Sequence, residues 1–340
     1  MVEPRDPPLR ESDIRPDDLM AGQAERYAAD VRRLLERRDE FVEVACPACE
    51  GTRAEELFRK YELHYRRCAD CATTYVSPRP PPAVLDWYYA TSENYAYWNR
   101  YVFPASEAAR RQKIFVPRVE RLAEIVQRRR LGTGVLLEVG AGFGLFCEEI
   151  VDRGLFRRVI AVEPTPDLAA RCRSRGLEVI ESPIEHVALP GLEVDVIANF
   201  EVIEHLFSPR DFLEQCRALL APERGVLMLT CPNGQGFDVS LLGAASSTFD
   251  TEHLNYFHPA SLTRLLERCG YEVLEVQTPG QLDAELVRKA VLAGQHALPD
   301  DPFLRRVLID DWDRLGAPFQ RFLSDNLLSS NMWLVARRAR

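Results

Sequence analysis

The sequence predicts an α/β fold in which helices cover both faces of a mostly parallel sheet. From about residue 130 onward, short segments rich in Val, Ile and Leu alternate with stretches of helical periodicity. The first five strand candidates are almost wholly apolar, as strands buried on both faces require. A glycine-rich turn directly follows the first of them, and such turns mark the ligand-binding edge of these sheets.

Bulk composition narrows the classes of function. The chain has 340 residues, of which 46% are hydrophobic and 28% charged, so we expect a globular protein of one large domain or two. No run of about 18 apolar residues is present, and the N-terminus lacks the apolar core of a secretory signal. We therefore expect a cytoplasmic protein without a membrane partner. The net charge of −9 disfavours a broad nucleic-acid surface.

Residues 1–40 are predicted to form a disordered start and a leading helix. The first 20 residues are rich in Pro, Asp and Arg, a composition that favours disorder. From Ala21 to Phe41, apolar residues such as Tyr27, Val31 and Leu34 recur at helical spacing.

Four of the nine cysteines form two C-x2-C pairs with 18 residues between them, which predicts a zinc ribbon over residues 41–82. Each pair presents two thiolates to one side, and two pairs complete a tetrahedral site. Because the protein would fill all four positions, we expect the zinc to be structural. The predicted ligands are Cys46, Cys49, Cys68 and Cys71. The scattered cysteines are expected to be buried small apolar residues, and they are Cys147, Cys172, Cys216, Cys231 and Cys269.

An aromatic connecting segment is predicted over residues 83–104, after the stiff break at Ser77–Pro82. Its rings could stack on a sugar or a base, or could pack the ribbon onto the main domain, and the sequence favours neither. The aromatic residues are Trp87, Tyr88, Tyr89, Tyr95, Tyr97, Trp98, Tyr101 and Phe103.

The main domain is predicted over residues 105–340. It opens with a helix around residues 105–129, and residues 281–330 are predicted to be helices inserted before the last strand, where they could form a lid. The expected strands are Val135–Val139, Val159–Glu163, Leu177–Ile180, Val194–Asn199, Val226–Thr230, Tyr271–Val276 and Met332–Ala336.

The glycine-rich turn spans Gly140–Gly144 and leads into a helix that starts near Leu145. Glycine permits the sharp bend and lets the backbone approach a ligand. A dinucleotide fingerprint requires Gly or Ala at Leu145, and Glu138 would sit badly beside a pyrophosphate but would suit a ligand with an ammonium group. Glu163, at the end of the next strand, can accept hydrogen bonds from both ribose hydroxyls. This set predicts S-adenosylmethionine as the ligand.

With these motifs, residues 105–280 resemble the class I methyltransferases, which have a Rossmann-like seven-stranded fold and modify small molecules. The resemblance implies that the residues around the glycine turn surround the methionine moiety, and that Glu163 binds the ribose. It implies that the turn from Ser182 to Ile184 lies near the adenine. We expect His205 to be a helical residue hydrogen-bonded beneath the site. The other residues implied at the cofactor are Glu138, Gly140, Gly142, Gly144, Asn199 and Phe200.

A second informative stretch, Phe249–His258, follows the fifth strand, where the loops of open α/β sheets bind substrates. His253, beside the carboxylate of Glu252, is a candidate general base. Alternatively, His253 caps the helix that begins near Pro259.

The zinc ribbon, the aromatic segment and residues 250–257 together resemble the sugar-nucleotide C-methyltransferases of deoxysugar biosynthesis. This narrower resemblance implies a sugar or sugar nucleotide as the substrate, and His253 as the base that removes a proton α to a keto group. Glu252 would be its neighbour in the site. A tyrosine would hold or protonate the sugar; we take Tyr97 as the candidate, and Tyr95 stays open.

Two departures from that family widen the prediction. Thr251 stands where the family usually has a second His, and the family's further C-terminal domain is not found in this sequence. O-methylation, which needs the same base, therefore stays open beside C-methylation. The alternatives are an rRNA base methyltransferase, disfavoured by the acidic composition, and a non-catalytic scaffold, disfavoured by the intact glycine turn. The sequence predicts no oligomeric state.

Overall fold

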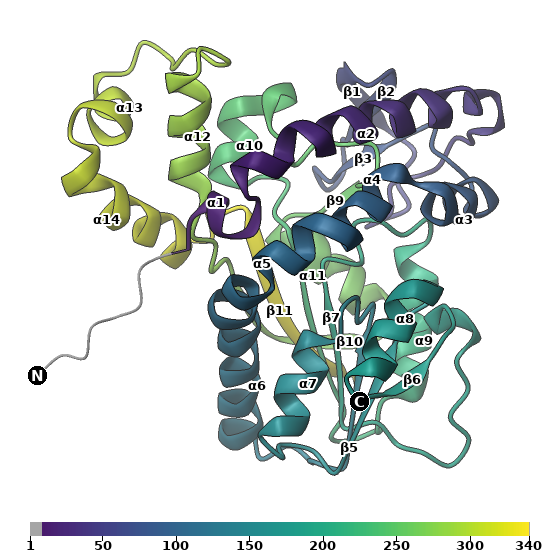
Figure 1. Cartoon of the computed structure of the whole chain (residues 1–340). Helices are drawn as coiled ribbons and strands as arrows, with labels where there is room; N and C mark the ends of the chain where they lie inside the picture. The colour runs from purple at the N-terminus through teal and green to yellow at the C-terminus, as the bar shows by residue number, and fades with distance from the viewer. Residues whose placement is uncertain (1–8, 340) are drawn as a thin grey trace, which may run out of the picture.

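A seven-stranded sheet forms the centre of the computed structural model, which describes residues 9–339 (Figure 1). Its strands are β4 (Val135–Val139), β5 (Arg158–Val162), β6 (Glu178–Ile180), β7 (Val196–Phe200), β8 (Val226–Pro232), β10 (Tyr271–Gln277) and β11 (Asn331–Arg338). Their order is β10-β11-β8-β7-β4-β5-β6, and only β11 runs antiparallel to both of its neighbours. This order confirms the predicted Rossmann-like class I fold.

Each predicted strand lies within two residues of the observed one, and β4 has the predicted bounds. Among the strand starts the largest shift is at β7, which begins at Val196 rather than Val194. The Asp195 carboxylate there accepts hydrogen bonds from the backbone N–H groups of Gly134 and Val135, each at 2.9 Å. Asp195 therefore joins the start of β7 to the start of β4.

Helices cover both faces of the sheet, as predicted. On one face, α6 (Val116–Arg129), α7 (Leu145–Asp152) and α8 (Pro166–Ser174) share a buried core with alternate residues of β4. On the other face, α9 (Pro209–Leu219) and α11 (Pro259–Arg268) pack on the remaining residues of that strand. Because β4 is buried on both faces, its apolar sequence does not alternate with polar residues.

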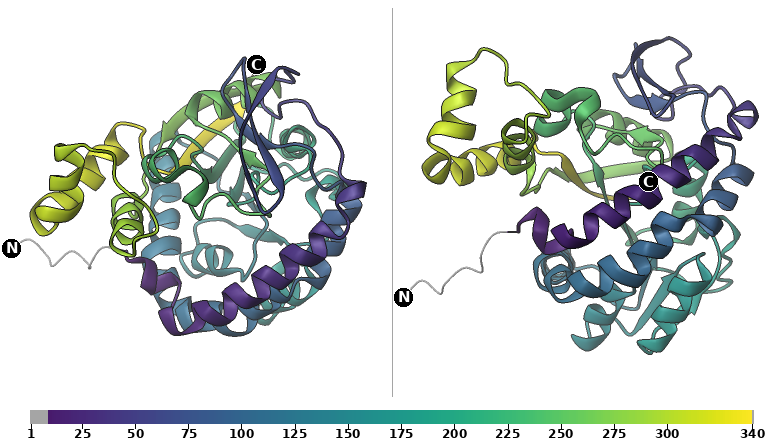
Figure 2. Two further views of the ribbon diagram at one scale, coloured as in Figure 1. Left: turned by 90° about the horizontal axis from the view of Figure 1, so that it is seen from above. Right: turned by 45° about the horizontal axis from the view of Figure 1, so that its top comes forward.

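A small antiparallel sheet holds the cysteine segment. Its strands are β1 (Ala54–Lys60), β2 (Leu63–Cys68), β3 (Thr74–Val76) and β9 (Asn255–Tyr256), in that order. The last strand comes from the main domain, where Thr74 pairs with Tyr256 and Tyr75 with Asn255. The ribbon is therefore joined by backbone pairing to the segment that carries His253, at one end of the large sheet (Figure 2).

The N-terminal part is more ordered than the sequence predicts. Residues 1–8 lie outside the described residues, but residues 11–14 form α1 (Glu11–Ile14), and α2 (Asp17–Leu35) begins before Ala21 and ends before Phe41. Asp17 and Asp18 in the first turn favour the positive end of the helix dipole. The α1 segment is anchored by Lys113, which contacts Asp13 at 2.7 Å.

The aromatic segment is helical except at Ser92, whose backbone is extended, and continues into the helix predicted at residues 105–129. It consists of α3 (Pro82–Thr91), α4 (Glu93–Tyr97), a π-helical turn (Trp98–Val102) and α5 (Phe103–Arg110), and a second π-helical turn (Arg111–Phe115) joins it to α6. The α2 helix runs alongside α4 (Figure 2). Several rings of the segment pack on Leu34 of α2, which accounts for part of its aromatic content.

Helices lie before the last strand, as predicted. They are α12 (Asp283–Leu292), α13 (Pro302–Arg305), a π-helical turn (Arg306–Asp310) and α14 (Trp312–Asp325), and they project to one side of the molecule (Figure 1). Their core packs on α10 (Phe237–Leu242) through Leu242, Ala284 and Val287. A lid function for this insertion stays a prediction. Within residues 9–339, no helix is long and apolar enough to cross a membrane.

Candidate active site

The carboxyl ends of β7, β4, β5 and β6 lie side by side, and we call this part of the sheet edge the cofactor half. The turn after β4 needs glycine for its backbone, because Gly140, Gly142 and Gly144 have φ angles of 73°, 55° and 73°. A Cβ at Gly140 would lie 2.6 Å from Val202, whereas one at Gly142 would meet nothing within 4 Å. The turn is therefore packed from below at Gly140 and open to a ligand at Gly142.

Glu163 closes this turn from the next strand. Its carboxylate accepts hydrogen bonds from the backbone N–H groups of Gly142 at 2.8 Å and Thr165 at 2.9 Å. Burial raises the pKa of Glu163 above its usual value. Each carboxylate oxygen has a second lone pair, so the group can still accept from two ribose hydroxyls. This geometry fits the nucleoside part of S-adenosylmethionine.

Glu138 lies beneath the turn, with 2% of its surface exposed. The Cys147 thiol donates to its carboxylate at 3.0 Å, and burial raises the pKa of Glu138 to about 8. A buried carboxylate without a full ion pair favours a cationic neighbour, which is consistent with the ammonium group of the expected ligand.

At the end of β7, the Asn199 side chain is fully buried, and neither its amide nitrogen nor its carbonyl oxygen has a hydrogen-bond partner. A buried amide without partners is costly unless a ligand satisfies it. Phe200 is also buried, with its ring centroid 4.7 Å from that of Phe146. Both residues thus lie on the edge beside the glycine turn.

The two residues expected near the adenine follow β6. Ser182 is partly exposed, and its hydroxyl donates to the carbonyl of Pro183 at 3.1 Å. Ile184 is buried and begins a short 3-10 helix (Ile184–His186). Ser182 could contact a ligand over the turn, whereas Ile184 supports the turn from the core.

A cavity of about 510 Å³ lies beside the cofactor half. Its walls come from α1, the start of α6, the end of β8, the loop 246–253 and the beginning of the helical insertion. We call these walls the acceptor half. Arg118 joins the two halves, because its guanidinium lies 4.4 Å from the Phe200 ring centroid and 3.4 Å from the Glu201 carboxylate. The cavity has the size of a small-molecule site.

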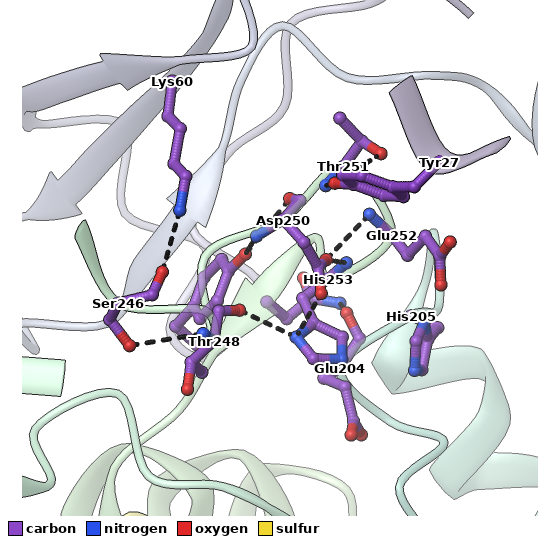
Figure 3. A network of polar contacts seen from close by, with 12 residues as sticks. Tyr27, Lys60, Glu204, His205, Ser246, Thr248, Asp250, Thr251, Glu252 and His253 are labelled. Atoms are coloured by element: carbon purple, nitrogen blue, oxygen red, sulfur yellow. Dashed lines mark hydrogen bonds and ion pairs between the residues drawn. The ribbon is translucent and has the colours of Figure 1, made fainter. Parts of the chain in front are cut away.

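His253 lines this cavity from the loop 246–253. Its backbone N–H donates to Asp250 at 2.7 Å, and its ring Nδ1 lies 2.9 Å from the carbonyl oxygen of Thr248 (Figure 3). A carbonyl can only accept, so Nδ1 carries the proton and Nε2 carries the lone pair. The helix cap that we considered for His253 is formed by His258, the residue before α11.

Glu252 points toward the aromatic helices. Its carboxylate accepts a hydrogen bond from the Tyr88 hydroxyl at 3.0 Å and lies within hydrogen-bonding reach of Tyr95. Burial, and then the charge of Asp250, raise the pKa of Glu252 to about 7. Tyr97 instead donates to the backbone carbonyl of Leu19 in α2, at 3.2 Å. The fold thus brings Tyr95, rather than Tyr97, to the carboxylate.

His205 lies beside His253 in a turn, not in the helix that the sequence predicts, because Glu201 has a positive φ of 56° and the chain turns after β7. The ring centroids of His205 and His253 are 4.7 Å apart. Burial and the neighbouring His253 lower the pKa of His205 well below its usual value. The adjacent Glu204 is 1% exposed, and burial raises its pKa well above the usual value.

Sequence reasoning missed that Glu204 and His205 join His253. The signal was a Glu-His pair directly after a parallel strand, at the edge where sites form. The pair alone does not predict the group, because His253 lies 48 residues beyond His205 in the sequence.

The four predicted metal ligands are brought together. The thiols of Cys46 and Cys71, and those of Cys49 and Cys68, are each 3.5 Å apart, and all four lie within 4.8 Å of one another. Tetrahedral zinc with Zn–S bonds of about 2.3 Å separates its sulfur atoms by ~3.8 Å. After each pair the chain turns through a residue with positive φ, 61° at Glu50 and 58° at Ala72. The cluster therefore suits a four-coordinate metal.

Comparisons with known proteins indicate the family of the chain. A model of a methyltransferase-domain family matches residues 108–276. A protein named "Probable S-adenosylmethionine-dependent methyltransferase" from Mycolicibacterium smegmatis is 32% identical over 206 residues, which cover 56% of this chain and 76% of that protein. A ubiquinone biosynthesis O-methyltransferase from Dinoroseobacter shibae is 27% identical over 154 residues, 41% of this chain and 60% of that protein.

Among solved structures, an S-adenosylmethionine-dependent methyltransferase from Clostridium acetobutylicum superposes with a TM-score of 0.47 at 10% identity. The superposition covers 72% of this chain and 99% of that one.

Proposed function

Because the chain belongs to the S-adenosylmethionine-dependent methyltransferases, we propose that it methylates an oxygen or carbon atom of a sugar or sugar nucleotide. The observation that carries the proposal is His253, whose Nδ1 is held by the Thr248 carbonyl and whose ring lines a cavity beside the cofactor half. A cavity of about 510 Å³ suits a small acceptor better than a folded RNA.

Bound S-adenosylmethionine supplies the methyl group on an electrophilic sulfonium. The chain's own task is then to remove a proton from the acceptor. The lone pair on Nε2 of His253 is available for a proton from a hydroxyl, or from a carbon next to a keto group. Glu252 and Tyr95 lie behind the loop as hydrogen-bonding neighbours, and we propose that they position the loop that carries His253. The similarity to O-methyltransferases supports oxygen as the methylated atom.

The residues that would hold the cofactor are those of the cofactor half. Glu163 and Asn199 offer unsatisfied hydrogen-bonding capacity at the ends of β5 and β7, the two strands that flank β4, and Gly142 in the turn after β4 leaves open space. We further propose that the four-cysteine cluster holds zinc in a structural role, because the protein supplies all four ligands.

Two alternatives make different predictions. A nucleic-acid methyltransferase needs a basic surface next to the site, but the lining Arg15, Lys113 and Arg118 are each paired with a carboxylate. A non-catalytic scaffold needs no cofactor site, yet the glycine turn, Glu163 and Asn199 are all suited to one.

The test is incubation of the full chain with labelled S-adenosylmethionine and a panel of nucleotide-linked sugars in hydroxyl and 4-keto forms, with RNA in a parallel reaction. We expect label in one class of sugar, and mass spectrometry of the product then distinguishes O- from C-methylation. Label in RNA alone would move the function to nucleic acid. Cofactor binding with no labelled sugar would contradict the proposal, and no cofactor binding at all would favour the scaffold.

A further inference from the structure

A second group of metal-ligand side chains lies against the acceptor half, apart from the cysteines, and shares His253 with it. It consists of Glu204, His205 and His253, whose ligand atoms all lie within 4.8 Å of one another. Figure 3 shows the three side chains close together beside the loop 246–253. Two come from the turn after β7 and the third from the loop after α10, so the fold rather than the local sequence assembles the group.

Glu204 is the strongest indication of a missing partner. Its side chain is 1% exposed, and neither carboxylate oxygen has a hydrogen-bond partner. A buried carboxylate with no partner is among the most costly arrangements in a folded protein. Two imidazoles lie beside it, and each has Nδ1 engaged: that of His205 lies 3.3 Å from the Tyr89 hydroxyl, and that of His253 lies 2.9 Å from the Thr248 carbonyl. The cation would therefore bind the other ring nitrogen of each. A cation between them would satisfy all three groups.

Two further acidic side chains surround the group. Glu201 lies three residues before Glu204, and the Asp250 carboxylate is 3.4 Å from Nδ1 of His253. The neighbouring Arg118 contacts Glu201 at 3.4 Å, while the Glu204 carboxylate keeps no hydrogen-bond partner.

We infer that Glu204, His205 and His253 bind a first-row divalent cation, such as Zn²⁺, Fe²⁺ or Co²⁺, with a position left open for an oxygen of the acceptor. Two imidazoles and one carboxylate are a ligand set typical of these ions, whereas Mg²⁺ and Ca²⁺ favour oxygen ligands alone. The carbonyl of Thr248 fixes the proton of His253 on Nδ1, which leaves Nε2 to bind metal. Hydrogen bonds to the second ring nitrogen commonly fix a metal-binding histidine in this way.

This inference refines the proposed function. The role of the cation in catalysis rests on that proposed function, whereas binding of the cation does not. One lone pair cannot serve both a cation and a proton. In the metal-bound protein His253 is therefore a ligand, and a coordinated acceptor hydroxyl loses its proton more readily because the cation lowers its pKa. The proton would pass to a carboxylate of the cavity wall, Asp250 or Glu201.

The test titrates Co²⁺ into the full chain, with zinc already bound at the cysteine cluster. Neither S-adenosylmethionine nor an acceptor is present. Co²⁺ bound by nitrogen and oxygen gives visible ligand-field absorption without the near-ultraviolet thiolate charge-transfer band of a cysteine site. We expect one equivalent to bind with that signature. Glu204→Gln and His205→Ala should each weaken binding at least about tenfold, since even outer-sphere changes cost that much. His64→Ala is the matched control, because His64 pairs with Glu56 on the exposed ribbon hairpin and should leave binding unchanged.

No binding, binding with the thiolate band only, or binding that survives Glu204→Gln would overturn the inference. Thermal unfolding and cofactor affinity of each variant show whether it is folded. If sugars are methylated but Co²⁺ does not bind, the metal site fails and the proposed function stands. If Co²⁺ binds as expected but no sugar is methylated, the metal site stands and the acceptor assignment fails.

Discussion

The two halves of the active edge are built in different ways. The cofactor half comes from four adjacent strand ends within residues 138–200, and short local motifs define it. The acceptor half comes from α1, the start of α6, the end of β8, the loop 246–253 and the beginning of the insertion. The ribbon sheet supports that loop: Lys60 donates to the Ser246 carbonyl at 2.8 Å, and Tyr65 donates to the Asp250 carbonyl at 2.7 Å. The comparison suggests that damage to one half should leave the other half working.

The largest expected effect comes from the ribbon. Cys46→Ser should abolish metal binding at the cysteine cluster, whose stabilisation in small zinc modules is about 10 kcal/mol or more. The loop 246–253 then loses its support, so we expect methyl transfer to be almost lost, while S-adenosylmethionine affinity changes by less than about threefold. Zinc content, turnover and calorimetric cofactor binding measure the three quantities.

Cys269→Ser is the matched control, because Cys269 lies at the end of α11, outside the cluster. It should retain zinc and turnover. An equal loss of cofactor affinity and turnover in Cys46→Ser would show that the halves are not separable.

The next largest effect belongs to the cofactor half. Glu163→Ala removes a carboxylate that pins Gly142 and is expected to bind the ribose. Hydrogen bonds to charged groups contribute about 1.5–3 kcal/mol, so the dissociation constant of S-adenosylmethionine should rise roughly ten- to a hundredfold. Calorimetry measures it, with Glu178→Gln, an exposed ion-pair residue on β6, as the control. Unchanged affinity would remove Glu163 from the site.

A smaller effect should distinguish two tyrosines. Tyr95→Phe removes a hydroxyl near Glu252, and we expect turnover to fall about tenfold with cofactor affinity unchanged. Tyr97→Phe removes a hydroxyl that donates to the backbone carbonyl of Leu19 in α2, away from Glu252, so turnover should stay near the wild-type value. Steady-state kinetics on both variants compare them directly. The reverse pattern would favour the tyrosine that the sequence first suggests.

The smallest expected effect concerns pH and stability. Burial raises the pKa of Glu252 to about 7, above its unfolded value. Between those two pKa values the folded state holds a proton that the unfolded state has lost, so the free energy of unfolding falls as pH rises toward 7 and then levels off. Between pH 5 and 8 the free energy of unfolding of the wild type should fall by an amount on the order of 1 kcal/mol, and Glu252→Gln should not show this fall. Urea unfolding at both pH values measures it; the same pH dependence in the variant would assign it to another group.

Most of the fold was predictable because its signals are local. Buried parallel strands read as apolar runs, and two C-x2-C pairs specify their own geometry, so the sheet order and the cysteine cluster follow from short segments. The ordered start at Glu11–Ile14 was not predictable, because its anchor, Lys113, lies a hundred residues away.

The acceptor half was harder to predict for the same reason. His253 stood out beside a carboxylate, but its neighbour His205 follows a different strand, and only the turn at Glu201 brings the two rings together. Tyr95 and Tyr97 are two residues apart on one helix and face different partners, Glu252 and α2. Spacing in the sequence does not reveal which face of a short helix meets the site.

The central claim is that His253 acts on the acceptor and not on the cofactor. The most direct measurement is single-turnover methyl transfer by wild type and His253→Ala. Each protein is saturated with labelled S-adenosylmethionine and given the sugar that the panel experiment identifies as the acceptor. We expect the variant to transfer the methyl group about 10²–10⁴ times more slowly while its cofactor dissociation constant stays the same. Transfer at the wild-type rate, or a loss explained entirely by weaker cofactor binding, would contradict the account.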